Sequence, residues 1–335
     1  VNPMNTTSAT NTMNPRNQPP LIEVDCLKTW FPVRRGILSR TIGHVRAVDG
    51  ISFALQKGET IGLVGESGCG KTTLGRTLVG LEKIHAGRIK FQGRNLAGLS
   101  RKELRALRRK IQIIFQDPLS SLNPRMNILD IITEGIREFK LIRGDREKAA
   151  RGILKDVGLD ADALYRYPHE FSGGQRQRIN IARAISLKPD FIVCDEPVSA
   201  LDVSIQAQII NLLLDLREKY HLSYLFISHD VSVVSHIANR IAVMYMGRIV
   251  EFGETGDIVF RPRHPYTQAL ISAVPRPGSH RDQWSAIDEK PPSPSVPPKG
   301  CRFHPRCPEV LDVCRNEAPK ETDQAGHTVS CHLYK

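Results

Sequence analysis

The stretch 65-GESGCGKTT-73 places three glycines, one lysine and two threonines directly after the apolar run 61-IGLV-64. Each glycine in regular structure costs roughly 0.5–1 kcal/mol relative to alanine, so this density indicates that the backbone must be exposed here. The stretch fits G-x-x-x-x-G-K-[ST], in which glycines let backbone N–H groups approach phosphate oxygens. A helical pattern, 72-TTLGRTLVGL-81, follows and points its positive end at the same place. The sequence therefore predicts a phosphate-binding loop, with Lys71 on the β- and γ-phosphates and Thr72 on Mg²⁺.

A second stretch, 191-FIVCDE-196, ends an apolar run with two carboxylates. A buried strand that delivers an aspartate at its carboxyl end is one way in which such folds hold Mg²⁺. We predict this role for Asp195. The next residue, Glu196, is placed to polarise an attacking water molecule.

Short β-rich runs alternate with helical patterns between about Leu21 and Phe252, which favours a parallel sheet covered on both faces. The strand candidates are 51-ISFAL-55, 61-IGLV-64, 111-IQIIF-115, 191-FIVC-194 and 223-SYLFIS-228. Helical patterns alone fill residues 117–189, which predicts an all-helical insertion. Apolar residues at helical spacing predict a helix over 203–220, with Asp202 as its N-cap.

A further anion-binding helix start is predicted at 171-FSGGQRQR-178, where a serine and two glycines precede a helical pattern. The chain thus has two phosphate-binding loops far apart in sequence. Either both loops form one continuous site within a monomer, or one loop completes a site on a partner chain.

The bulk composition is that of a soluble globular protein, with 335 residues, 40% of them hydrophobic and 24% charged. No apolar run approaches the roughly 20 residues that span a bilayer. Residues 1–19 are polar and lack the apolar core of a secretory signal, so we expect a disordered tail. The net charge of +12 suits acidic partners. Aromatic residues are not interleaved with the basic ones, which argues against nucleic-acid binding.

With these motifs in hand, residues from about Leu21 to Gly253 resemble the nucleotide-binding subunit of an ABC transporter. The matching motifs occur in the family order: GESGCGKTT as Walker A, 115-FQDP-118 as the Q-loop, 171-FSGGQ-175 as the signature, 194-CDEP-197 as Walker B, 199-SALD-202 as the D-loop and 227-ISHD-230 as the switch. Phe171 stands where the signature usually has leucine.

The resemblance implies an α/β fold, that of ABC-type P-loop NTPases. This fold has a RecA-like parallel-sheet core, an N-terminal antiparallel β subdomain and an all-helical insertion, here followed by a small Cys-rich C-terminal extension. We place the ATPase domain at 20–260, its helical subdomain at about 117–189 and the extension at 261–335.

The closer resemblance is to ATPase subunits of bacterial dipeptide and oligopeptide importers. It rests on 115-FQDPLSSLNPR-125, 194-CDEPVSALDVSIQAQ-208, 264-HPYTQAL-270 and 300-GCRFHPRCP-308. In that family two ATPase chains pair head to tail, and each nucleotide lies between one chain's Walker A and the other's signature loop. That arrangement would explain the two phosphate loops.

The resemblance also implies roles for single residues. Phosphates and Mg²⁺ are bound by the Walker A residues Gly65, Ser67, Gly68, Gly70, Lys71, Thr72 and Thr73. Gln116 senses the metal and links to the membrane subunit, and Asp195 supports Mg²⁺. Glu196 is the general base and His229 contacts the γ-phosphate. Ser172, Gly173 and Gly174 complete the partner's γ-phosphate site.

The adenine-stacking aromatic side chain is expected upstream of Walker A. Phe31 is our first choice and Trp30 the second. The alternative for Phe31 is an ordinary core side chain.

Four of the seven cysteines crowd into the last part of the chain, with the spacing Cys301-x5-Cys307-x6-Cys314-x16-Cys331. A cytosolic chain is kept reduced, which argues against disulfides, and four thiolates suit an iron–sulfur cluster or Zn²⁺. The importer resemblance implies a [4Fe–4S] cluster. Zinc and unligated thiols are the alternatives. We expect His304, His327 and His332, which lie nearby in sequence, at the surface.

The resemblance predicts an ATP- and Mg²⁺-dependent subunit that powers import of di- or oligopeptides, or related small solutes. It would be peripheral to the cytoplasmic face of the bacterial inner membrane. The implied partners are a second, similar but distinct ATPase chain, two transmembrane permease subunits and a solute-binding protein, and no nucleic acid. The second reading is a soluble ABC ATPase without a transport role, and the third is an exporter ATPase. The cargo is not encoded in these motifs.

Overall fold

The computed structural model describes residues 19–36, 40–141, 144–273, 292–293 and 296–334. The predicted disordered tail lies outside these residues, except for residue 19. Residues 274–291 and 294–295 lie outside them as well.

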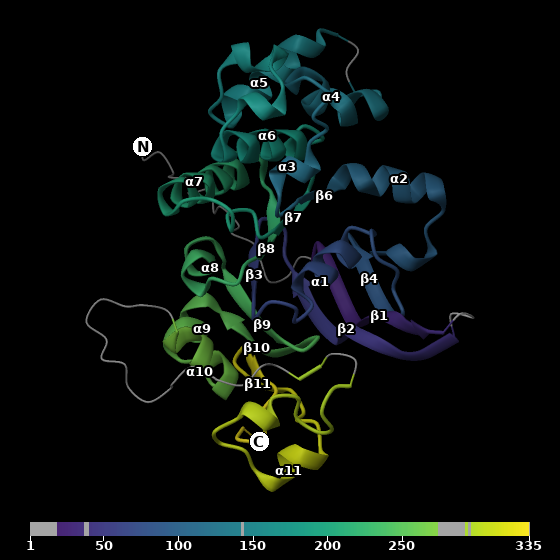
Figure 1. Ribbon diagram of the computed structural model, residues 1–335, viewed down its shortest axis with the longest axis vertical. Helices are drawn as coiled ribbons and strands as arrows, with labels where there is room; N and C mark the ends of the chain where they lie inside the picture. The colour runs from purple at the N-terminus through teal and green to yellow at the C-terminus, as the bar shows by residue number, and fades with distance from the viewer. Residues whose placement is uncertain (1–18, 37–39, 142–143, 274–291, 294–295, 335) are drawn as a thin grey trace, which may run out of the picture.

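The centre of the molecule is an eight-stranded sheet with the order β11-β12-β10-β9-β3-β8-β7-β6 (Figure 1). Its neighbours β6–β7, β7–β8, β8–β3 and β3–β9 are parallel. Strands β10, β11 and β12 extend the sheet in antiparallel fashion. The strands are β3 (Thr60–Val64), β6 (Ile111–Ile114), β7 (Phe191–Asp195), β8 (Ser223–Ile227), β9 (Arg240–Tyr245), β10 (Arg248–Glu254), β11 (Thr322–Gln324) and β12 (His327–Val329).

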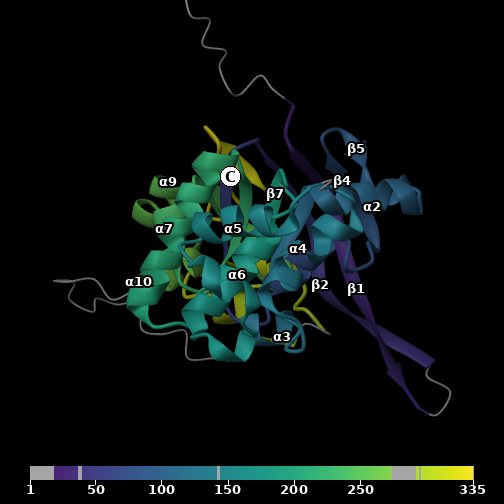
Figure 2. The same ribbon diagram turned by 90° about the horizontal axis from the view of Figure 1, so that it is seen from above.

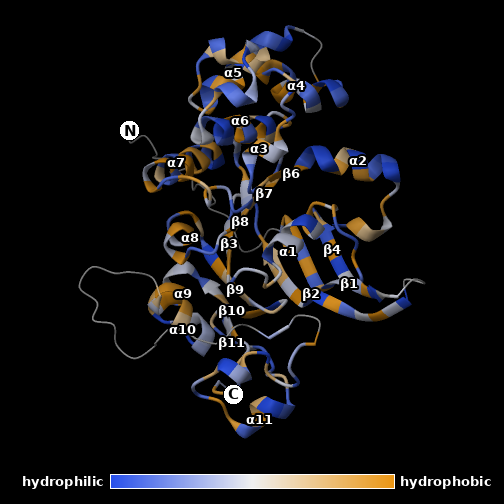
Figure 3. Ribbon diagram, in the orientation of Figure 1, coloured by the Kyte–Doolittle hydropathy of each residue, from blue (hydrophilic) through white to orange (hydrophobic). Residues whose placement is uncertain are grey.

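A second sheet has four strands in the order β2-β1-β4-β5, and all of its pairs are antiparallel. Its strands are β1 (Ile22–Arg35), β2 (Arg40–Leu55), β4 (Ala86–Phe91) and β5 (Arg94–Asn95). The run 51-ISFAL-55, which we grouped with the parallel strands, belongs to β2 in this sheet, because it is the end of a strand that begins at residue 40 and forms a hairpin with β1. Figure 2 shows this hairpin projecting beyond the body of the molecule, and Figure 3 shows the alternation of hydropathy along it.

Helices fill the predicted insertion between β6 and β7, and the described residues there contain no strand. Predicted helix 203–220 is confirmed as α7, with Asp202 at its N-cap position but without a side-chain capping bond. Helix α1 ends earlier than predicted, because Gly80 adopts a positive φ of 73° that turns the chain away. The helices are α1 (Lys71–Leu78), α2 (Arg101–Lys110), α3 (Pro118–Ser121), α4 (Ile128–Glu138), α5 (Arg146–Asp156), α6 (Gly173–Ile185), α7 (Val203–Tyr220), α8 (Val231–Ile237), α9 (Thr255–Phe260), α10 (Pro265–Ser272) and α11 (Asp312–Asn316). Short 3₁₀ helices span Leu96–Gly98, Ala161–Tyr165, Pro168–Glu170 and His304–Arg306.

The central sheet divides two hydrophobic cores. Successive side chains of a strand point to opposite faces, so Phe191 and Val193 of β7 join the core beneath the antiparallel sheet. Ile192 and Cys194 join the core shared with α7 and the helical subdomain. The parallel strands are therefore buried on both faces, as their continuous apolar sequence predicts.

The C-terminal residues return to the central sheet, because β12 pairs with β10. In Figure 1 this part (yellow) lies at the end of the molecule opposite α4 and α5. Our expectation that His327 lies at the surface is wrong. Its side chain is buried, and Nε2 lies 2.7 Å from a carboxylate oxygen of Glu251, which is also buried.

Candidate functional site

The predicted phosphate loop connects β3 to α1 and lies against the β9–β10 turn. A Cβ atom on Gly65 would stand 2.2 Å from the Met244 carbonyl oxygen, and one on Gly70 would stand 2.0 Å from that of Ala47. Gly65, Gly68 and Gly70 have positive φ angles, a region that glycine adopts freely. The close backbone contacts at both ends of the loop explain why it is glycine-rich.

Lys71 begins α1, and its side chain is turned into the loop. The residue is only 5% exposed, and Nζ donates to the carbonyl oxygens of Gly65 at 2.7 Å and Glu66 at 3.0 Å. The loop therefore surrounds a positive charge, which is what phosphate binding requires at this position.

The structure brings Thr72 and Asp195 together. The Thr72 hydroxyl donates to Oδ1 of Asp195 at 2.9 Å, across the end of β7. Burial raises the pKa of the Asp195 carboxyl, while the Thr72 hydrogen bond and the charges of Arg76 and Lys71 act in the opposite direction. An oxygen pair of this kind, partly desolvated, suits a hard cation such as Mg²⁺.

Glu196 follows Asp195 and is the point where three separate segments meet. Nε2 of Gln116 donates to its Oε2 at 3.0 Å, and Nδ1 of His229 lies 3.5 Å from the same oxygen. The Glu196 backbone has a φ of 47°, which is uncommon for a residue with a side chain. Its N–H donates to the Ile227 carbonyl at 3.0 Å and holds this conformation. Such strained residues cluster at functional sites.

The predicted signature residues start helix α6 in the helical subdomain. The Ser172 hydroxyl accepts the N–H of Gln175, whose side chain in turn accepts the N–H of Ser172, forming a capping box. Figure 1 shows α6 among the helices at the top and α1 beside the antiparallel sheet. The structure thus joins Gln116, Asp195, Glu196 and His229 near the phosphate loop, and places Ser172, Gly173 and Gly174 on another element.

The two candidates for the adenine-stacking residue are neighbours on β1 and point to opposite faces of the sheet. Trp30 stacks on His85 with ring centroids 4.4 Å apart, and its Nε1 donates to Asp49. Phe31 is 37% exposed. Trp30 is thus engaged within the fold whereas Phe31 is accessible, and the assignment of adenine stacking stays a prediction.

Three of the C-terminal cysteines, Cys301, Cys314 and Cys331, are buried, and Cys307 is half-buried. Burial, with a smaller contribution from the other cysteines of the set, raises the pKa of Cys307 and of Cys331 to about 11. Within the described residues, no group of three or more His, Cys, Asp or Glu side chains is placed to hold a metal ion. The structure therefore lends no support to the predicted iron–sulfur cluster, nor to the zinc alternative.

Contacts between the phosphate loop and the C-terminal residues were not predicted. Glu66, inside the loop, is contacted by Tyr266 and Arg306. The sequence contains both residues within the stretches 264-HPYTQAL-270 and 300-GCRFHPRCP-308, but the pattern alone does not show what they touch.

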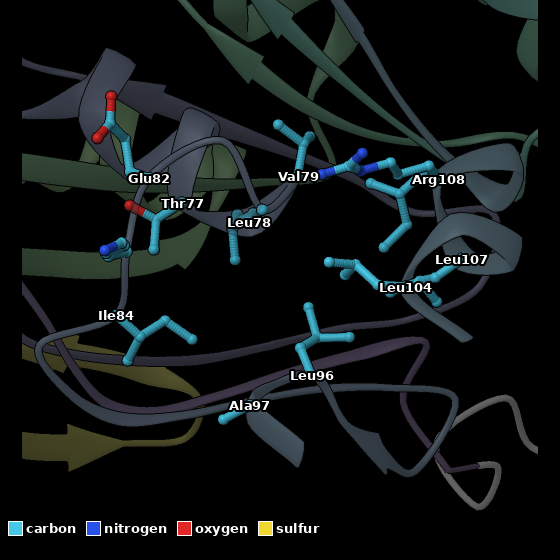
Figure 4. A pocket seen from close by; sticks show the side chains of 13 residues that line it. Thr77, Leu78, Val79, Glu82, Ile84, Leu96, Ala97, Leu104, Leu107 and Arg108 are labelled. Carbon is cyan, nitrogen blue, oxygen red and sulfur yellow. The ribbon is translucent and has the colours of Figure 1, made fainter. Parts of the chain in front are cut away.

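A separate apolar pocket of about 310 Å³ lies at the far end of α1 from Lys71. Figure 4 shows Leu78, Ile84, Leu96, Leu104 and Leu107 around it. Because no residue of the loop 65–73 lines it, it is not the phosphate site.

Comparisons with known proteins fit this geometry. The family described as "ABC transporter" matches residues 48–199, and the family "Oligopeptide/dipeptide transporter, C-terminal region" matches residues 250–314. The oligopeptide transport ATP-binding protein AppF of Bacillus subtilis is 49% identical over 96% of this chain and 100% of its own. The chain belongs to the ABC transporter ATP-binding proteins. A probable peptide ABC transporter ATP-binding protein of Sinorhizobium fredii, y4tS, is 48% identical over 93% of this chain and 90% of its own.

Solved structures of ABC ATPases share the fold. The cbiO1 protein of Clostridium perfringens, part of the transporter complex cbiONQ, has a TM-score of 0.62 and 26% identity, covering 72% of this chain and 91% of its own. The dimeric ATP-binding cassette MJ0796 bound to ADP and Pi has a TM-score of 0.61 and 25% identity, covering 70% of this chain and 98% of its own. Among the described residues, no helix has the length and apolar character that a membrane span requires.

Proposed function

We propose that this chain is the ATP-hydrolysing subunit of an importer for di- or oligopeptides, or related small solutes. Support comes from the transporter-type C-terminal region and from relatives named as peptide transport proteins over nearly their whole length. The same findings argue against an ABC ATPase without a transport role.

The observation that carries the proposed chemistry is the meeting of Gln116, Glu196 and His229 beside the Thr72–Asp195 pair. In the proposed mechanism, Thr72 and Asp195 hold Mg²⁺, and Lys71 neutralises the β- and γ-phosphates. Glu196 accepts a proton from the attacking water, while Gln116 and His229 orient its carboxylate. Transition-state charge is stabilised by groups that are already in place.

We propose that hydrolysis needs two ATPase chains, with Ser172, Gly173 and Gly174 completing the site of the partner. Support comes from their place on α6, apart from the phosphate loop, and from the dimeric state of the related cassette. The partner is proposed to be a similar but distinct chain. Two permease subunits and a solute-binding protein would complete the complex at the cytoplasmic face of the bacterial inner membrane.

We also keep a [4Fe–4S] cluster on Cys301, Cys307, Cys314 and Cys331 as a proposal. Its support is the donor set in the sequence, four cysteines spaced x5, x6 and x16, whose thiolates would hold the cluster. Anaerobic purification with iron and sulfide analysis tests the proposal. The Cys314→Ser variant should lose the cluster, and Cys26→Ser, at an exposed cysteine outside the set, should keep it.

The function is tested by purifying the chain with its membrane subunits and assaying which solutes stimulate ATP hydrolysis. We expect permease subunits to co-purify and peptides to stimulate turnover through the solute-binding protein. A chain that never associates with membrane subunits, and whose ATPase activity ignores every peptide tested, would contradict the proposal.

A further inference from the structure

Glu66, the second residue of the phosphate loop, is bound by the C-terminal part of the chain. The two terminal nitrogens of Arg306 donate to its two carboxylate oxygens, Nη1 to Oε2 at 2.9 Å and Nη2 to Oε1 at 3.0 Å. The Glu66 N–H donates to the hydroxyl of Tyr266 at 2.8 Å. A bidentate pair fixes both the charge and the orientation of the carboxylate.

These contacts are partly buried, since the Glu66 side chain is 27% exposed. The Arg306 side chain is only 4% exposed, and its guanidinium lies 5.8 Å from the ring centroid of Tyr245. Tyr266 is fully buried and packs on Phe303 with ring centroids 5.5 Å apart. An arginine held in this way stays where its neighbours place it, because withdrawing it would leave a buried charge without a partner.

The same short segment, 301-CRFHPRC-307, also reaches the β9–β10 turn that lies against the loop. Arg302 donates to the Met246 carbonyl and to the buried carboxylate of Asp49. The next residue, Gly247, donates its N–H to the Cys69 carbonyl at 2.8 Å. One segment therefore contacts the loop directly, through Arg306 and Glu66, and indirectly, through Arg302 and the β9–β10 turn that binds Cys69.

The charges of Glu66 and Arg306 bear on how the loop binds a nucleotide. A carboxylate in a phosphate loop repels the phosphates of ATP unless a cation neutralises it. Lys71 contacts the Glu66 backbone, not its carboxylate, so the neutralising partner is Arg306. A loop that is already ordered also loses less conformational freedom when ligand binds.

We propose that Arg306 is a positioning residue for ATP binding: through Glu66 it neutralises and orders the phosphate loop, and so makes nucleotide affinity dependent on the C-terminal region. Tyr266 supports the same contact. This inference rests on the proposed assignment of residues 65–73 as the ATP phosphate loop.

The test is a charge-balance experiment on the full-length chain, with fluorescent ATP-analogue binding and, in the assembled complex, KM and kcat for ATP. Arg306→Gln leaves the Glu66 carboxylate unneutralised and should raise KM and Kd about tenfold, which corresponds to about 1.4 kcal/mol. The effect should fall on KM far more than on kcat. The double variant Glu66→Gln/Arg306→Gln removes both charges and should return KM toward the wild-type value.

Two further variants refine the test. Tyr266→Phe keeps the packed ring but removes the acceptor for the Glu66 N–H, and should raise KM by a smaller factor. Arg315→Gln changes an exposed arginine of the same region and should leave KM unchanged. If Arg306→Gln fails to fold, the double variant and Arg306→Lys replace it in the test. Arg306→Lys keeps the charge without the bidentate pair and should give an intermediate KM.

Equal KM values for wild type and Arg306→Gln would overturn the inference. So would a double variant as impaired as Arg306→Gln, because a purely structural role of Arg306 predicts no recovery. Lys71→Ala separates this failure from failure of the loop assignment: if Lys71→Ala also binds ATP normally, then residues 65–73 are not the phosphate loop at all.

Discussion

At the scale of the residue, the Glu196 carboxylate is where chemistry and local structure meet. Its positive φ aims the side chain toward Gln116 and His229, and the hydrogen bond from its N–H to Ile227 holds the turn. Strained backbone conformations of this kind cluster at functional sites, which fits the proposed role of Glu196 as the base.

The Glu196→Gln substitution should retain ATP binding and lower kcat by about two to four orders of magnitude, the usual contribution of a general base. The amide keeps the shape and the hydrogen-bonding capacity of the side chain but cannot accept the proton. Single-turnover hydrolysis and nucleotide binding by the assembled complex measure the two effects separately. The matched control is Glu218→Gln, at an exposed glutamate of α7. Wild-type turnover in Glu196→Gln would rule out the role.

At the scale of the element, the start of α10 is tied to β10 by a buried histidine. The His264 ring accepts the Tyr266 N–H at 3.0 Å, and the His264 backbone donates to Glu251. Burial lowers the pKa of His264 from 6.5 to about 3. In the folded protein this ring is therefore neutral at physiological pH.

The low pKa of His264 predicts a pH dependence of folding stability. Between pH 6.5 and about 3, His264 is protonated in the unfolded chain but stays neutral in the folded chain. Lowering the pH therefore favours unfolding. The histidine's stabilisation is complete above pH 6.5 and is lost as the pH falls. Its slope is at most about 1.4 kcal/mol per pH unit. Urea unfolding across this range should show a shallower slope for His264→Asn, which keeps a capping acceptor. An unchanged slope would show that other groups dominate.

The sequence was sufficient for elements with strong periodicity and for sites defined by spacing. Strands β3, β7 and β8, the helical insertion and helix α7 were all predicted, because runs of four residues or more carry a readable pattern. Strand β12 spans only His327–Val329, too short for alternation to show. The burial of His327 was missed because its partner, Glu251, is 76 positions away.

The same limit applied to the site. Family motifs in the sequence identified Gln116, Glu196 and His229 as candidates. The distances between them are set by the fold. The pair of Glu66 and Arg306 joins residues 240 positions apart, and no local pattern encodes such a contact. Long-range contacts between single residues are set by topology and packing, which periodicity does not report.

At the scale of the whole molecule, the two predicted phosphate-binding loops lie on different parts of the fold. A substitution at Gly173 tests whether the second loop contacts a partner chain. A Cβ atom there would have Leu201 as its nearest neighbour, at 3.4 Å, an ordinary contact. Alanine also favours a helix more than glycine does, by about 0.8–1.0 kcal/mol in a helix interior.

Gly173→Ala should therefore keep or raise the thermal stability of the chain and yet strongly reduce ATP hydrolysis, because the added methyl group would intrude on the partner's phosphate site. Thermal unfolding and ATPase assays of the assembled complex measure these effects. Gly152→Ala is the control, a helical glycine of α5 with open space around it. Full hydrolysis by Gly173→Ala would argue that this loop faces solvent.

The most direct measurement is ATP hydrolysis followed together with molar mass by light scattering, under assay conditions. We predict that chains at the monomer mass of 37.5 kDa hydrolyse no more ATP than the Glu196→Gln variant. Hydrolysis should appear only in fractions where the chain is paired with an ATPase partner. Robust, Glu196-dependent hydrolysis by a strictly monomeric chain would contradict a catalytic site shared between two chains.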